Sequence, residues 1–103
     1  MKFLNAQRIA LLPDGAIVAN TARGNMIDDD ALIAALKSGK VAAAGLNVFD
    51  GEPNIKKGYM ALDNSFLLPH IGSATTQARD AMSFCCLDNL DAFFAGRACP
   101  SPL

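Results

Sequence analysis

Short apolar runs separated by polar turns predict alternating strands and helices along residues 16–48. Residues 16–20 and 41–48 are almost entirely apolar, which is typical of strands buried on both faces. Between them, the aspartates at 28–30 suit the positive end of a helix, and the apolar spacing predicts this helix over 29–38, with Gly39 as its stop. A strand, a helix and a second strand in this order form a βαβ unit, so we expect an α/β fold with a parallel sheet.

The segments on either side of this unit predict shorter elements. Asn5 is placed to cap a helix over residues 6–12, which a Pro-Asp-Gly turn ends. The apolar pattern dissolves over residues 49–64, which predicts a connection with one helical turn at 59–62. A short strand is expected at 65–68, directly before a proline.

A long final helix is predicted from the hydroxyl-rich residues 73–76 toward Gly96. Its apolar residues recur at spacings of three and four and predict one stripe that packs against a partner element, in this chain or in another. The stripe comprises Met82, Cys86, Leu90, Phe93 and Phe94, with Cys85 beside it. We expect both of these cysteines to be small buried apolar side chains rather than reactive thiols.

The composition, 51% hydrophobic and 18% charged over 103 residues, predicts a folded domain and excludes a disordered chain. Nine basic and ten acidic side chains form no long run of one sign, so we expect neither a nucleic acid nor a membrane as partner. The N-terminus resembles no secretion signal, which favours a cytoplasmic protein. Three cysteines without a Cys-x-x-Cys pair favour neither a disulfide framework nor a metal site.

Three side chains suited to chemistry, Arg23, Glu52 and His70, each follow one of the apolar runs. The carboxyl ends of parallel strands open onto one edge of a sheet, so these side chains could meet there. A histidine beside a carboxylate is a suitable general acid for a carbonyl group, and an arginine can bind a carboxylate with two donors. Each residue alone is more often structural, as a packed histidine or a surface ion pair, and only their joint placement favours catalysis.

Three segments around these residues resemble consecutive motifs of the D-2-hydroxyacid dehydrogenases. They are Asn-Thr-Ala-Arg-Gly at 20–24, Ala-Gly-Leu-Asn-Val-Phe at 44–49 followed by Gly-Glu-Pro at 51–53, and Leu-Pro-His-Ile-Gly-Ser-Ala-Thr at 68–75. Their order and spacing agree with the family over nearly the whole chain, and the sequence looks most like the glyoxylate and hydroxypyruvate reductase branch. The resemblance implies the C-terminal half of a Rossmann-type parallel sheet with flanking helices and a long C-terminal helix from about residue 75. Residues 1–103 would then be part of an NAD(P)-binding domain.

The resemblance also implies the role of each candidate residue. Arg23 would bind the carboxylate and carbonyl of a small 2-oxo acid, His70 would donate the proton, and Glu52 would set the charge and orientation of His70. NAD or NADP is implied as cofactor, and the residues expected to lie against its nicotinamide are Thr21, Ala22, Arg23, Asn47, His70 and Gly72. Asn47 stands where the family usually has an aspartate; its neutral amide can still form hydrogen bonds, and asparagine is also a common turn former at a strand end.

The phosphate-binding motif Gly-x-Gly-x-x-Gly does not occur in this sequence. The resemblance therefore implies that the adenosine end of the cofactor site and the substrate-binding domain are absent from this chain. Two interpretations stay open: a catalytic segment that works when the missing half is supplied, or a catalytically silent, truncated α/β module that self-associates through its open sheet edge and its apolar final helix. In both, an open sheet edge favours a homo-oligomer or association with the missing N-terminal part.

Overall fold

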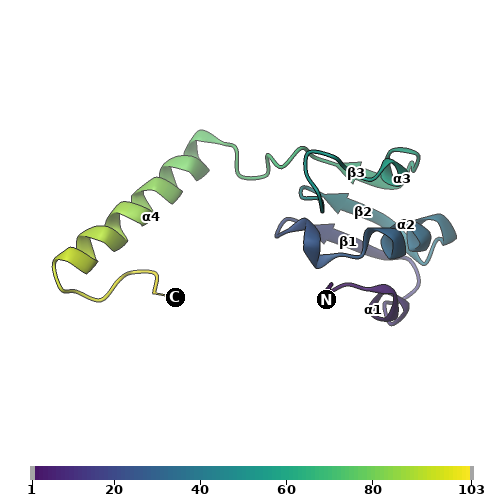
Figure 1. Ribbon diagram of the computed structural model, residues 1–103, viewed down its shortest axis with the longest axis horizontal. Coiled ribbons are helices and arrows are strands. Elements are labelled where there is room, and N and C mark those ends of the chain that lie inside the picture. The colour runs from purple at the N-terminus through teal and green to yellow at the C-terminus, as the bar shows by residue number, and fades with distance from the viewer. Residues whose placement is uncertain (1, 103) are drawn as a thin grey trace. The chain divides into compact units, whose positions relative to one another are not determined.

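The computed structural model describes residues 2–102 and contains a three-stranded parallel sheet with helices along its connections (Figure 1). The elements in chain order are α1 (Ala6–Ala10), β1 (Ala16–Asn20), the 3-10 turn η1 (Gly24–Met26), α2 (Asp29–Ser38), β2 (Val41–Leu46), α3 (Lys57–Met60), β3 (Ser65–Leu67) and α4 (Thr76–Phe94). The chain divides into two compact units, of which the first ends at Ile71 and the second begins at Gly72. The sheet belongs to the first unit and α4 to the second.

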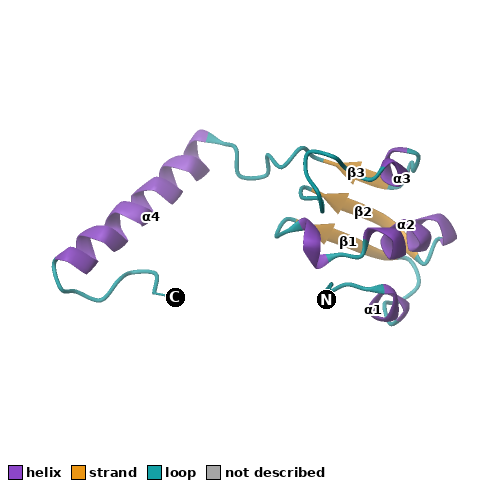
Figure 2. Cartoon of the chain, viewed as in Figure 1, coloured by secondary structure: helices purple, strands orange, loops and turns teal. Residues whose placement is uncertain are grey.

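Both strand pairs of the sheet are parallel, in the order β1-β2-β3. Val18 lies opposite Ala44, and Leu46 of β2 pairs with Asn20 on one side and with Leu67 on the other. The predicted βαβ unit is therefore confirmed, with α2 as its connection. Figure 2 shows the three strand arrows pointing the same way, so the loops that follow them leave from one edge of the sheet.

Helix α2 has the bounds that its terminal residues predict. The Asp28 side chain accepts a hydrogen bond from the Ala31 N–H at 3.2 Å, and Asp29 and Asp30 follow in the first turn, where negative charge favours the helix dipole. Gly39 ends the helix with a φ of +78°, a left-handed conformation that glycine adopts without strain. The prediction of a helix over 29–38 is confirmed.

The shorter elements occur in the predicted order, with differences at their ends. Asn5 caps α1 by accepting the Arg8 N–H at 3.0 Å, but the helix ends at Ala10 because the Leu11 N–H bonds back to the Arg8 carbonyl in a tighter turn. The helical turn expected at 59–62 is α3, two residues earlier. Strands β2 and β3 end two residues and one residue before their predicted ends.

Among the described residues of the first unit, the core lies against one face of the sheet. Buried side chains of the strands pack with side chains of α1 and α2 and with Tyr59 of α3. The largest fully buried side chains of this core are Leu32, Val41 and Tyr59. No described element of the first unit covers the other face: Ile17 is 77% exposed and Phe66 is 67% exposed. The prediction that these apolar strands are buried on both faces is wrong for this chain, because successive side chains of a strand point to opposite faces and α2 packs with the core on one of them.

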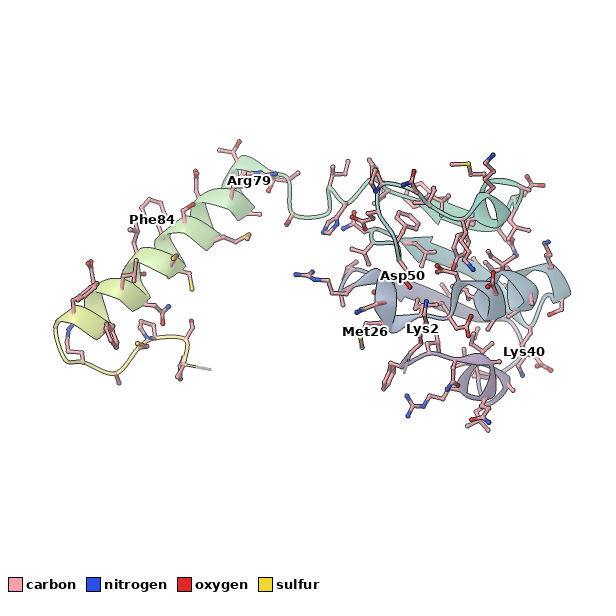
Figure 3. The ribbon with its side chains drawn as sticks, in the orientation of Figure 1. Lys2, Met26, Lys40, Asp50, Arg79 and Phe84 are labelled. Atoms are coloured by element: carbon pink, nitrogen blue, oxygen red, sulfur yellow. The ribbon has the colours of Figure 1, made fainter. Side chains whose placement is uncertain are left out.

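An ion pair ties the N-terminal segment to the loop that follows β2. Lys2 Nζ lies 2.6 Å from Asp50 Oδ2, and Figure 3 shows the two labelled side chains next to each other. A second pair, between Lys40 and Asp14, spans the other ends of β1 and β2 at 2.7 Å. Both pairs are partly exposed, so each contributes little stability by itself.

The second unit consists of α4 and the residues on either side of it. Thr75 caps the helix by accepting the Ala78 N–H at 3.1 Å, which confirms the predicted start. Ala92 is the buried residue of α4, whereas the stripe residues, and also Phe84 (labelled in Figure 3) and Leu87, are exposed. The predicted burial of Cys85 and Cys86 is wrong, since both are exposed. One helix with a short tail is too little chain to enclose so many apolar side chains.

Within the described residues, no helix is both long and apolar enough to cross a membrane.

Candidate active site

The loop after β1 is shaped by the side chain of Asn20, the last residue of that strand. Asn20 is buried; its amide nitrogen donates to the Arg23 carbonyl at 2.9 Å, and its amide oxygen accepts the Ala22 N–H at 3.0 Å. These two bonds hold Thr21, Ala22 and Arg23 in a tight turn at the sheet edge. Sequence reasoning assigns no role to Asn20, although an asparagine directly after an apolar run is the signal of such a turn.

The loops after β1 and β2 touch backbone to backbone at Gly24. A Cβ atom on this buried glycine would lie 1.9 Å from the carbonyl carbon of Phe49 and 2.2 Å from the nitrogen of Asp50. Only a residue without a side chain allows this approach. Gly24 therefore brings the segment that carries Arg23 against the segment that leads to Glu52.

Each carboxylate oxygen of Glu52 has a partner. Oε1 accepts the Phe49 N–H at 2.7 Å, and Oε2 lies 2.8 Å from His70 Nδ1. The hydrogen bond from His70 is the largest cause that lowers the pKa of Glu52 below its usual value; the Phe49 N–H and the positive charge of Arg23 lower it further. Glu52 is thus ionised near neutral pH, and its Oε2 accepts a hydrogen bond from the Nδ1–H group of His70.

His70 follows β3 in an unusual backbone conformation. Its φ is +56°, the left-handed region that residues other than glycine seldom adopt. Two hydrogen bonds surround it: the His70 N–H donates to the Leu68 carbonyl at 2.9 Å, and the Ile71 N–H donates to Asn47 Oδ1 at 2.9 Å. The imidazole is about half exposed. With Nδ1 directed to Glu52, Nε2 is the ring nitrogen that can exchange a proton with a bound molecule.

Arg23 lies at the same edge without bonding to Glu52. Its guanidinium is exposed and donates from Nη1 to the Ala22 carbonyl at 2.6 Å, while its charge still acts on the Glu52 carboxylate. Thus the structure brings Glu52 and His70 into direct contact and places Arg23 within electrostatic range of them. An exposed guanidinium can turn toward an incoming anion.

A cavity of about 310 Å³ opens beside the Glu52 and His70 side chains. Its remaining walls are mostly apolar, and the lining residues are Phe49, Glu52, Pro53, Ile55, Leu67, Leu68, Pro69 and His70. A largely apolar cavity with a few polar groups at one end is typical of a small-molecule site.

The other residues expected at the cofactor differ in their surroundings. Thr21 and Ala22 are exposed in the turn after β1, whereas Asn47 is buried at the end of β2. Gly72 is the first residue of the second unit. The cofactor roles of these four residues stay predictions.

The sequence of the first unit decides the family. A family model described as D-isomer specific 2-hydroxyacid dehydrogenase, NAD binding domain, matches residues 1–72. The chain belongs to this family. Its parallel sheet with flanking helices is accordingly a Rossmann-type fold, as expected from the resemblance.

Among curated members of the 2-hydroxyacid dehydrogenase family, the chain is 54% identical over 94 residues to a glycerate dehydrogenase of Hyphomicrobium methylovorum. This alignment covers 91% of the chain and 29% of that enzyme. It is 46% identical over 101 residues to a glyoxylate reductase of Pyrococcus furiosus, covering 98% of the chain and 30% of that enzyme. A solved structure, the NADPH-dependent glyoxylate/hydroxypyruvate reductase from Sinorhizobium meliloti in complex with NADP and malonate, aligns with a TM-score of 0.82 at 38% identity, over 97% of this chain and 31% of that one.

The chain therefore spans less than a third of the length of these relatives.

Proposed function

We propose that this chain carries the catalytic residues of an NAD(P)-dependent reductase that interconverts 2-oxo acids and D-2-hydroxy acids of the glyoxylate and hydroxypyruvate type. The observation that carries the proposal is the 2.8 Å contact between Glu52 Oε2 and His70 Nδ1, at the sheet edge where Arg23 also lies. A carboxylate, an imidazole and a guanidinium at one edge supply what reduction of a 2-oxo acid requires: an anion-binding group and an oriented proton donor.

Arg23 binds the carboxylate of the substrate and polarises the neighbouring carbonyl oxygen. The planar guanidinium can give two parallel hydrogen bonds to a carboxylate, which fixes both the position and the orientation of the acid. The turn held by Asn20 presents Arg23 at the sheet edge, and its exposure leaves it accessible to a small acid.

His70 acts as the general acid through Nε2. The ionised carboxylate of Glu52 accepts the Nδ1 proton, which fixes the orientation of the ring and leaves Nε2 to carry the proton that is transferred. A reduced nicotinamide supplies the hydride to the carbonyl carbon when it is bound. The carbonyl oxygen takes the Nε2 proton as it becomes a hydroxyl, and a neutral imidazole remains bonded to Glu52 through Nδ1. In the opposite direction the neutral Nε2 takes the proton back.

The residues present fit the nicotinamide end of a dinucleotide. The turn at Thr21 and Ala22 is exposed directly after β1, and Asn47 follows the neighbouring strand β2 at the same edge of the sheet. We assign Thr21, Ala22, Arg23, Asn47, His70 and Gly72 to nicotinamide contacts, for NAD or NADP. The phosphates need the missing glycine-rich turn, so residues 1–103 form part of the NAD(P)-binding domain, and the remainder comes from the missing N-terminal part or from self-association.

The open face of the sheet favours a second candidate function, a silent module that self-associates. Ile17 and Phe66 are large, apolar and exposed on this face, and β1 is an edge strand. A module of this kind forms oligomers but has no reductase activity, so activity separates the two proposals.

The testing experiment measures NADH and NADPH oxidation by the purified 103-residue chain with glyoxylate or hydroxypyruvate, while light scattering records its oligomeric state. His70→Ala is the control. Turnover that disappears in His70→Ala supports a reductase that completes its cofactor site by association. An oligomer without turnover favours the silent module for the chain alone.

A hybrid enzyme then tests the catalytic residues independently of the missing part. In this hybrid, the chain replaces the segment that it matches in the Hyphomicrobium methylovorum glycerate dehydrogenase, to which it is 54% identical. The proposal predicts a hybrid that reduces hydroxypyruvate. A folded hybrid without activity would count against it.

A further inference from the structure

We infer that Asn47 is a positioning residue that holds His70 in its working conformation through the backbone N–H of Ile71. The inference rests on the proposed role of His70 as general acid and adds a task for Asn47 that is separate from any cofactor contact. It begins from one contact: Asn47 Oδ1 accepts the Ile71 N–H at 2.9 Å, across the ends of β2 and β3.

The conformation of His70 requires support from its neighbours. A φ of +56° is sparsely populated by residues with a side chain, and such conformations persist only where surrounding contacts enforce them. The peptide on the N-terminal side is fixed by the bond from the His70 N–H to the Leu68 carbonyl. The peptide on the C-terminal side is fixed by Asn47. Together the two bonds hold the backbone on both sides of His70, and with it the direction of the imidazole toward Glu52.

Asn47 is itself held rigidly enough to serve as an anchor. It is 6% exposed, and its own N–H donates to the Asn20 carbonyl at 3.0 Å, which continues the pairing of β1 with β2. One residue earlier, the Leu46 carbonyl accepts the Leu68 N–H at 2.8 Å. The end of β2 therefore binds the ends of both neighbouring strands. Through Asn20, the same row of contacts reaches the turn that carries Arg23.

The bond to Ile71 uses only the side-chain oxygen of Asn47. An aspartate offers an equivalent acceptor, whereas alanine offers none. The amide performs this task without adding a second negative charge at the edge where Glu52 is already ionised. The inference thus predicts that Asn47→Asp preserves the position of His70 and that Asn47→Ala does not.

Nuclear magnetic resonance of the ¹⁵N-labelled 103-residue chain tests this inference, because His70 is its only histidine. Glu52→Gln gives the ring signals of a His70 without its carboxylate partner, and Asn25→Ala, at an exposed asparagine, is the matched control. In Asn47→Ala we expect the His70 ring signals to move toward those of Glu52→Gln. The Ile71 amide should exchange with solvent roughly two- to tenfold faster, the scale of one lost hydrogen bond. Asn47→Asp and Asn25→Ala should keep the original ring signals.

Unchanged His70 ring signals in Asn47→Ala would overturn the inference, as would an Asn47→Asp chain that behaves like Asn47→Ala. The signals of Tyr59, the only tyrosine and fully buried, show whether each variant keeps its core. If Asn47→Ala does not fold, Asn47→Ser, with a hydroxyl too short to reach Ile71, is measured with the same two outcomes. No cofactor or turnover enters the measurement, so a failure here leaves the proposed reductase intact, and an inactive hybrid leaves this result intact.

Discussion

At the scale of single residues, the site depends on Glu52, whose two carboxylate oxygens form hydrogen bonds with two different partners. Oε1 is bound by the backbone of its own loop and Oε2 by His70, so the carboxylate is a fixed link between the end of β2 and the end of β3. Such a carboxylate orients an imidazole more strictly than a free one would. Both partners stabilise the ionised form, which makes the link sensitive to acid.

Glu52 should titrate below the ordinary range of a glutamate. Its pKa is lower in the folded chain than in the unfolded chain, so its stabilising contribution is present above the ordinary value, 4.5, and is lost as the pH falls through the lower folded value. Glu52 is the only glutamate of the sequence, so the ¹³C signal of its side-chain carboxyl group measures the midpoint of its titration directly. His70→Ala should raise the midpoint, because the His70 bond is the largest cause of the shift.

Asp50 serves as the control in this titration. Its pKa is lowered chiefly by the hydrogen bond from Lys2, so it should not respond to His70→Ala. A Glu52 midpoint that is the same with and without the imidazole would contradict the contact.

Arg23→Lys in the hybrid enzyme should weaken substrate binding more than it slows the chemistry. Lysine keeps the charge but loses the two parallel donors of the guanidinium. We expect KM for hydroxypyruvate to rise about tenfold, the effect of one lost charge-assisted hydrogen bond of about 1.5 kcal/mol, with a smaller change in kcat. Steady-state kinetics check this, with Arg8→Lys as the matched control on α1. An unchanged KM would remove Arg23 from the substrate site.

At the scale of elements, the sequence predicts where a helix begins and ends more accurately than it predicts which side chains are buried. The cap at Asp28 and the stop at Gly39 directly flank α2, so the sequence predicts its bounds. Burial depends on what covers an element: Ile17 and Cys85 have the sequence of buried residues but are exposed in this chain. The meeting of Arg23, Glu52 and His70 at one edge follows from the parallel sheet, whereas the side-chain bonds of Asn20 and Asn47 depend on loop geometry that no apolar pattern encodes.

Gly24→Ala should disturb the site and destabilise the first unit. The added Cβ would lie 1.9 Å from the Phe49 carbonyl carbon, so two backbone segments must separate, at a cost of about 1–3 kcal/mol or more. Urea denaturation measures the loss. Gly45→Ala is the matched control, because a Cβ there meets nothing within 4 Å and should change stability by about 0.5 kcal/mol or less. Equal effects of the two substitutions would show that the loops after β1 and β2 are not in close contact.

At the scale of the whole molecule, the first unit is held together across one face of its sheet. Tyr59 is fully buried in the core: its hydroxyl donates to Asp29 at 2.8 Å, which joins α3 to the start of α2, and its ring meets Phe49 edge to face. Tyr59 therefore both stabilises the core and supports Phe49, which lies in the loop before Glu52.

Burial and the bond to Asp29 raise the pKa of Tyr59 far above its ordinary value. A group with a raised folded pKa stabilises the fold below its unfolded pKa, about 10 for tyrosine, and loses that contribution as the pH rises further. The first unit should therefore unfold in alkali, and the absorbance of tyrosinate should appear together with the loss of circular dichroism. Tyrosinate that forms near pH 10 in a chain that stays folded would show that Tyr59 is not buried.

The hybrid enzyme tests the central claim, that this chain holds a competent set of catalytic residues, most directly through the rate of D-glycerate formation from hydroxypyruvate. Wild-type hybrid is compared with His70→Ala and with the matched surface variant Lys57→Ala, which lies on α3 outside the site. We predict D-glycerate from the wild-type hybrid, a loss of about a hundredfold or more in His70→Ala, the scale of general acid catalysis, and no loss in Lys57→Ala. A His70→Ala hybrid that forms D-glycerate at the wild-type rate would contradict the account.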